Sequence, residues 1–177
     1  MIFAWLTDIH LEFLTDHEVQ LFFQKIVDAK TSGIFLTGDI SITKNISHHL
    51  TLMAKMLSVP IYFVLGNHDY YGGKISETRH MVETIANDSN NLCYLPTAGV
   101  IELTDSVCLI GHGSWADGRF GASHNSHVIL NDYLKIEDFI GKGKVERFAL
   151  LNQLGDQAAI YLEKSLQRAI ELYVNIY

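Results

Sequence analysis

The chain has 177 residues, of which 48% are hydrophobic and 19% charged, and its formal net charge is -7. This apolar content is enough for one packed domain and excludes a disordered chain. Lys and Arg form no cluster, so binding to nucleic acid or to an anionic membrane is not favoured, although bound divalent cations could still attract a phosphorylated substrate.

Short apolar runs alternate with helical patterns through the first half of the chain. Thr15 and Glu18 have the spacing of a capping box at the start of a helix, and Pro60 separates a helical pattern from the clearest apolar run. Alternating strands and helices predict an α/β fold with parallel βαβ units and both faces of the sheet covered. We expect buried strands at residues 2–7, 34–37 and 61–65, and helices over residues 15–27 and 46–57.

The second half of the chain has longer irregular stretches. A polar Thr104-Asp105-Ser106 turn between two apolar runs predicts a β-hairpin. The Gly-, His-, Asn- and Asp-rich residues 111–143 are typical of a long surface loop. We expect helices over residues 75–86 and 145–173, the second interrupted near Gly155.

The cysteines and the short apolar runs indicate the cellular compartment of the protein. Cys93 and Cys108 lack CxxC spacing and lie in apolar surroundings, which is typical of buried free thiols. The first apolar run stops at Thr7, too soon for a signal peptide, and no run approaches the ~20 residues of a membrane span. We expect a soluble cytoplasmic protein without a membrane partner.

Polar residues follow each of the predicted strands. Asp8 and His10 come after the first strand, Asp39 after the second, and the Gly-Asn-His-Asp run of residues 66–69 after the third. Loops at the carboxyl ends of parallel strands meet at one crevice, so these side chains should lie together. Carboxylates and imidazoles accept Mn, Fe or Zn, and a shared carboxylate can hold two ions about 3.5–4 Å apart. Such a pair polarises a phosphoryl group and activates a bridging water.

The order DxH, GD and GNHD, each closing a strand, resembles the calcineurin-like metallophosphoesterase superfamily. The resemblance is strong over residues 2–70 and looser over residues 111–119. It implies the N-terminal portion of a four-layer α/β/β/α sandwich. It also implies hydrolysis of a phosphate mono- or diester with two divalent metal ions (Mn, Fe or Zn), on a phosphorylated small molecule or a phosphodiester.

The resemblance also implies a role for each residue of the motifs. By it, Asp8 and His10 hold the first metal, Asp39 bridges both, Asn67 holds the second, and His68 acts on the leaving group or stabilises the transition state. The sequence gives no firm role to the neighbouring Asp69.

The family pattern requires further histidines, including a GHxH motif that this sequence lacks. His112 follows an apolar strand, as an isolated histidine of the family does, but an ordinary loop residue would look the same. The pair His124 and His127 resembles GHxH only in having two nearby histidines, and the pair His48 and His49 lies on a predicted helix. Whether His112 or the later pair completes the site stays open.

The simpler explanation is that residues 1–177 form a single calcineurin-like domain that is incomplete at its C-terminal end. Apolar sheet and helix surface would then be left uncovered, so we expect a homo-oligomer or poor solubility. The activity of the chain would be weak or absent. The alternative function is a non-catalytic metal-binding or assembly module derived from the same fold.

Overall fold

A four-stranded parallel sheet with the order β1-β2-β3-β4 forms the centre of the fold. The computed structural model describes residues 1–114, 117–119 and 126–177. The predicted strands and their parallel pairing are confirmed, whereas the three-residue β4 was not predicted because so short a run has no periodicity. The strands are β1 (Phe3–Leu6), β2 (Gly33–Thr37), β3 (Ile61–Val64) and β4 (Leu92–Tyr94).

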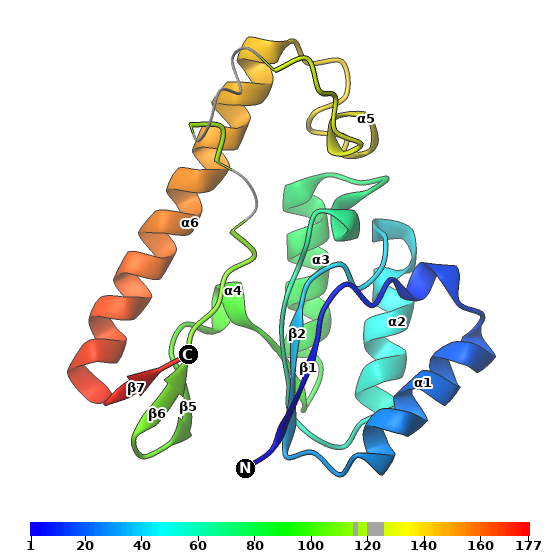
Figure 1. Cartoon of the computed structure of the whole chain (residues 1–177), viewed down its shortest axis with the longest axis vertical. Helices are drawn as coiled ribbons and strands as arrows, with labels where there is room; N and C mark the ends of the chain where they lie inside the picture. The colour runs from blue at the N-terminus through cyan, green and yellow to red at the C-terminus, as the bar shows by residue number, and fades with distance from the viewer. Residues whose placement is uncertain (115–116, 120–125) are drawn as a thin grey trace.

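Helices α1 (Asp16–Asp28), α2 (Thr43–Met56) and α3 (Ile75–Asn87) connect these strands and cover one face of the sheet (Figure 1). The predicted capping box opens α1: the Thr15 hydroxyl accepts from the Glu18 backbone N–H, and the Glu18 carboxylate accepts from the Thr15 N–H. Between sheet and helices lies the core, which includes the fully buried Phe23, Leu50 and Phe63.

The opposite face of the sheet is only partly covered, so the expectation of two covered faces and of a buried first strand is wrong. Phe3, Phe35 and Tyr62 form an aromatic cluster there and are half-buried, while Trp5 on β1 is 74% exposed. The remaining elements stand beside this face and bury little of it. This partly covered face is an apolar surface of the kind that the expected homo-oligomer would bury. The homo-oligomer itself stays a prediction.

A second, three-stranded sheet and a long helix lie on the side of the first sheet that faces away from α1 and α2 (Figure 1). The hairpin of β5 (Ile101–Thr104) and β6 (Val107–Leu109) is confirmed, and β7 (Asn175–Ile176) pairs parallel with β6. The short α4 (Leu95–Ala98) leads from β4 toward this sheet. Among the described residues, no helix is both long and apolar enough to cross a membrane.

Helix α6 (Lys144–Leu172) is continuous, which corrects the expected interruption at Gly155. The glycine serves close packing there: a Cβ on it would lie 3.1 Å from the Asp117 carboxylate. Arg119 pairs with Asp117 and Asp156 at the same place, so the segment of residues 117–119 is fastened to the helix.

Residues 126–143, here called the cap segment, were expected to be a surface loop but contribute to the core. The segment contains α5 (Asp132–Lys135), and its Ile136 and Phe139 are almost completely buried. It is held on the loop after β3 because the Gly72 N–H donates to the Lys135 carbonyl and the Glu137 N–H donates to the Gly73 carbonyl. The cap segment therefore reaches the carboxyl edge of the main sheet.

Unequal coverage of the two sheet faces predicts unequal costs for the same substitution on neighbouring strands. Phe63→Ala should lower the free energy of unfolding by about 3–5 kcal/mol, because it opens a cavity under the helices. Phe35→Ala, on the open face, should cost roughly 1–2 kcal/mol from lost aromatic contact. Urea denaturation of both variants measures the difference, and equal losses would mean that the outer face is covered after all.

Candidate metal centre

The ends of β1 and β2 continue side by side beyond the sheet and bring two of the predicted motifs together. The Asp8 N–H donates to the Gly38 carbonyl at 3.2 Å, and the His10 N–H donates to the Asp39 carbonyl at 3.0 Å. The pairing continues with Leu11 N–H to the Ile40 carbonyl at 2.9 Å. The DxH segment is thus aligned with the GD turn by backbone hydrogen bonds.

The backbone at this edge has an unusual conformation. Asp8, His10 and Asp39 have φ values of 52°, 43° and 50°, in the left-handed region that costs a non-glycine residue about 1–3 kcal/mol. The neighbouring turn needs a true glycine: a Cβ on Gly66 would lie 2.1 Å from Asp39 Oδ1. Such strain at adjacent strand ends is typical of functional sites, and here it coincides with the predicted ligands.

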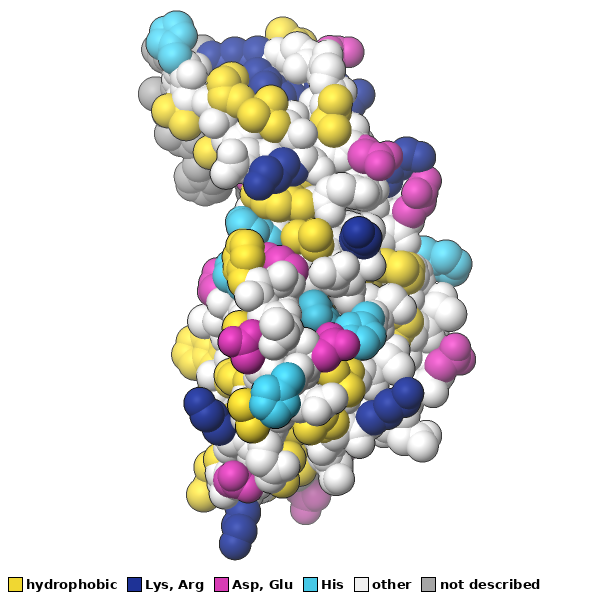
Figure 2. All heavy atoms as spheres, turned by 90° about the vertical axis from the view of Figure 1, so that its right-hand side faces the viewer, with side chains coloured by type: hydrophobic (Ala, Val, Ile, Leu, Met, Phe, Trp, Pro, Cys, Tyr) yellow, Lys and Arg dark blue, Asp and Glu magenta, His cyan; other side chains and the backbone are white. Residues whose placement is uncertain are grey.

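The structure brings His10, Asp39 and His68 into one cluster. Each offers a ligand atom, and these atoms all lie within 4.8 Å of one another on half-buried side chains. His10 Nε2 is 3.9 Å from Asp39 Oδ2, while Asp39 Oδ1 accepts a hydrogen bond from the His68 backbone N–H at 3.1 Å. Figure 2 shows histidine and acidic side chains gathered where the narrow upper part of the molecule meets its wider body.

The other two predicted ligands are placed differently. Asp8 is exposed, and its carboxylate accepts a hydrogen bond from the Thr7 hydroxyl instead of joining the three-residue cluster. Asn67 directly precedes His68 and directs its amide nitrogen to Asp132 at 2.7 Å. The roles of Asp8 and Asn67 as metal ligands, and of His68 as acid, stay predictions.

Glu12 was missed from the sequence but supports the cluster. Its Oε1 lies 3.1 Å from His10 Nδ1, which leaves the other ring nitrogen directed at Asp39. Carboxylates commonly hold metal-binding histidines in this way and fix their tautomer. Glu12 Oε2 is buried and has no hydrogen-bond partner among the described residues. The only signal in the sequence is its position two residues after His10, which is too weak to have identified it.

Asp69, to which the sequence gave no role, connects the two ligand loops. Its side chain is fully buried, and Oδ1 accepts from the Ile40 and Ser41 backbone N–H groups at 2.9 and 2.8 Å. Oδ2 accepts from the Gly66 N–H at 2.8 Å. Burial raises the pKa of this carboxyl from 3.8 to about 7, against the opposing effect of these hydrogen bonds.

The further histidines considered from the sequence do not join the cluster where they are described. His112 is half-buried beside Tyr161, and its Nδ1 accepts from the Ser114 N–H; burial lowers the pKa of the His112 imidazole. His127 is exposed, and His124 lies outside the described residues. His48 pairs with Asp16 on the surface, and His49 is buried against the Ser41 hydroxyl. None of these observations completes a second ligand set within the part of the chain that the structure describes.

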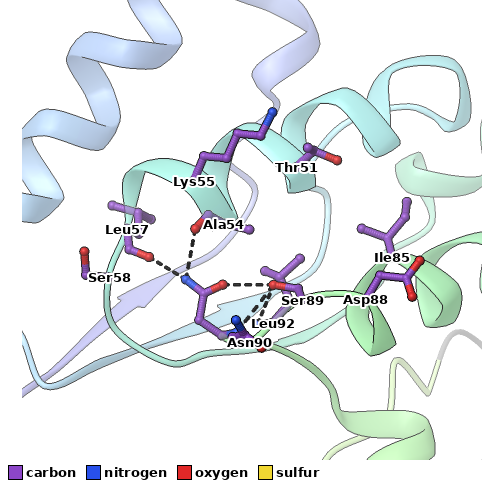
Figure 3. Close-up of a pocket in the computed structure, with 11 residues that line it drawn as sticks. Thr51, Ala54, Lys55, Leu57, Ser58, Ile85, Asp88, Ser89, Asn90 and Leu92 are labelled. Carbon is purple, nitrogen blue, oxygen red and sulfur yellow. Dashed lines mark hydrogen bonds between the residues drawn. The ribbon is translucent and has the colours of Figure 1, made fainter.

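A surface hollow at the opposite edge of the sheet contains none of the predicted residues. It lies between the C-terminal ends of α2 and α3 (Figure 3). The Asn91 amide in this hollow is already paired, since it donates to the Ala54 and Leu57 carbonyls and accepts from the Ser89 hydroxyl. The carboxyl edge, where His10, Asp39 and His68 converge, is the stronger candidate for a metal centre.

The fold and this cluster agree with the family that the motifs indicate. The family model of calcineurin-like phosphoesterases matches residues 1–160, so the chain belongs to the calcineurin-like phosphoesterase family. A search of curated proteins by sequence finds no match.

Comparison with solved structures supports the same fold. The crystal structure of a phosphopantetheinyl hydrolase from Mycobacterium tuberculosis superposes with a TM-score of 0.59 over 97% of this chain, at 12% sequence identity. The chain spans 64% of that protein's length, which is less than two thirds. At this identity the likeness shows the α/β fold of the family, and it extends to the second sheet and α6 as well as to the motif-bearing half.

The raised pKa of Asp69 predicts a specific pH dependence of stability. Between about 4 and about 7 the folded protein holds a proton that the unfolded chain has released, so the free energy of unfolding falls as pH rises through this window. Urea denaturation in the presence of EDTA at several pH values measures this fall.

The matched variant is Asp69→Asn, which cannot titrate. Its stability should lack this component of the fall, although it should be about 1–3 kcal/mol lower at acid pH because an amide NH₂ would face the Gly66 N–H. Parallel pH profiles for the two proteins would show that Asp69 is ionised throughout.

Proposed function

We propose that the protein is a metal-dependent phosphoesterase whose metal centre lies at the carboxyl edge of the main sheet. One observation carries the proposal: His10, Asp39 and His68 come from three separate strand ends and present ligand atoms within 4.8 Å of one another. The substrate would be a phosphate mono- or diester. Hydrolysis of such an ester by the whole protein is part of what we propose.

The donor set fits divalent ions of the Mn, Fe and Zn group. The His10 imidazole and the Asp39 carboxylate are ligands that these metals accept, and an amide oxygen from Asn67 would add a further donor. Asp39 has one oxygen held by the His68 backbone N–H and the other directed toward His10. Glu12 Oε2 is buried without a hydrogen-bond partner among the described residues, which is a further sign that the region is arranged for a positive charge.

Ions held there would supply Lewis acidity, polarising a phosphoryl oxygen and lowering the pKa of a water. The residues of the chain would do the rest. Asp39 would hold both ions, with Asp8 and His10 on one and Asn67 on the other. The His68 ring stacks on Tyr71 with centroids 4.3 Å apart, which fixes its plane for proton donation to the leaving oxygen.

A second candidate is a non-catalytic metal-binding module, and the position of Asp8 favours it. Its carboxylate is turned to Thr7, so the described cluster has the donors for one ion more clearly than for two. Such a module would bind metal but would not hydrolyse p-nitrophenyl phosphate or bis(p-nitrophenyl) phosphate. Those two assays on the metal-loaded chain separate the candidates.

Asp39→Ala should remove most of the metal, since Asp39 is the carboxylate at the centre of the cluster. The measurement is metal content per chain by elemental analysis, after dialysis against Mn²⁺ and removal of excess ion. Asp28→Ala, which deletes an exposed carboxylate on α1, is the matched control and should leave the metal content unchanged. Equal metal content in wild type and Asp39→Ala would remove the assignment.

His68→Gln tests whether His68 acts as an acid or as a ligand. If it is the acid, the variant should keep its metal and lose about 10²–10⁴-fold in turnover of a substrate with a poor leaving group. A substrate with a p-nitrophenolate leaving group, which needs no proton, should be affected much less. Loss of metal comparable to that of Asp39→Ala would instead make His68 a ligand.

A further inference from the structure

We infer that Asp132, in the cap segment, is a positioning residue that turns the side-chain oxygen of Asn67 toward the metal centre. The inference rests on the proposed function, because Asn67 is a metal ligand only within it. Asp132 Oδ1 accepts one hydrogen bond from Asn67 Nδ2 at 2.7 Å and another from the Tyr71 hydroxyl at 2.6 Å. The two positions are 65 residues apart in the chain, so this contact depends on the fold.

The chemistry of the partners decides which way the amide faces. A carboxylate oxygen accepts hydrogen bonds, so the Asn67 group that contacts it must be the NH₂ and not the carbonyl. The carbonyl oxygen then lies at the other end of the amide. Within the described residues, no side chain or backbone group donates to it, which leaves it available to a cation.

Burial makes this arrangement rigid. The Asp132 side chain is buried, with 6% of its residue surface exposed, and the nearby Lys135 and Glu137 are tied to the Gly72–Gly73 backbone. The Tyr71 hydroxyl donates to the same carboxylate oxygen, which holds the Asp132 side chain in place. A short hydrogen bond to a buried carboxylate should restrict the Asn67 rotamer far more than solvent would.

The arrangement has a direct consequence for the metal. Without a fixed partner, an asparagine side chain rotates freely and can present NH₂, which cannot bind a cation, as readily as oxygen. Outer-shell groups that hold a ligand typically contribute about 10–100-fold to metal affinity. Asp132 would thus couple the cap segment to occupancy of the metal centre without touching the ion.

The test is Mn²⁺ binding to the full chain by isothermal titration calorimetry. Asp132→Ala should weaken binding by about 10–100-fold, and Asp132→Asn, whose carbonyl can still accept from both donors, should bind close to wild type. Glu137→Ala is the matched control: it deletes an exposed carboxylate from the same cap segment and should leave affinity unchanged. Asp132→Ser serves in place of Asp132→Ala if circular dichroism shows that the alanine variant does not fold.

A double-substitution cycle separates positioning from general damage to the fold. In an Asn67→Ala background, Asp132→Ala should cause no further loss of Mn²⁺ affinity, because the ligand it orients is gone. Additive losses, or wild-type affinity in Asp132→Ala, would overturn the inference while leaving the proposed function intact. A wild-type chain that binds no Mn²⁺ would overturn both.

Discussion

The carboxylate of Asp69 is the constraint on which the candidate site depends. It accepts backbone hydrogen bonds from the turn after β2, through Ile40 and Ser41, and from the turn after β3, through Gly66. The backbone carbonyl of Asp69 accepts a hydrogen bond from the Thr43 hydroxyl at the start of α2. Asp39 and His68 lie on these same two turns, so their separation is set by a buried group that does not itself approach a substrate. Such groups are costly to bury, and here the cost is offset by satisfying donors that no strand or helix partner reaches.

The sheet fixes the positions of the other residues of the site. Parallel pairing between β1 and β2 continues past the strands, so the left-handed residues Asp8, His10 and Asp39 are held by main-chain hydrogen bonds on both sides. The strain at these positions, about 1–3 kcal/mol for each, is sustained by the core beneath, where the inner sheet face packs against α1, α2 and α3. Stability is thus concentrated on one side of the sheet, and the strained ligand turns lie at its edge.

The sequence predicted what is local and missed what is long-range. Strands, helices and the Thr15 capping box follow from patterns within a few residues, and the meeting of the His10, Asp39 and His68 segments follows from parallel topology. Glu12, Asp69 and Asp132 could not be found in this way. Their roles depend on contacts with the ligands and ligand turns that no periodicity encodes. The open outer face was missed for the same reason: an apolar run at β1 does not reveal whether a second layer covers Trp5.

Charge gives the metal centre its strongest physical rationale. The carboxyl groups of Asp8, Glu12, Asp39 and Asp132 all lie on or beside the three ligand turns. Lys135 Nζ lies 5.0 Å from the Tyr71 ring centroid, and this one charge is outnumbered by the carboxyl groups. Such a surface repels a phosphate ester. Divalent cations would reverse the local field, which would make substrate binding conditional on the metal. The acidic net charge and a phosphorylated substrate are then compatible, because the ions that the carboxylates attract are the ones that would attract the phosphate.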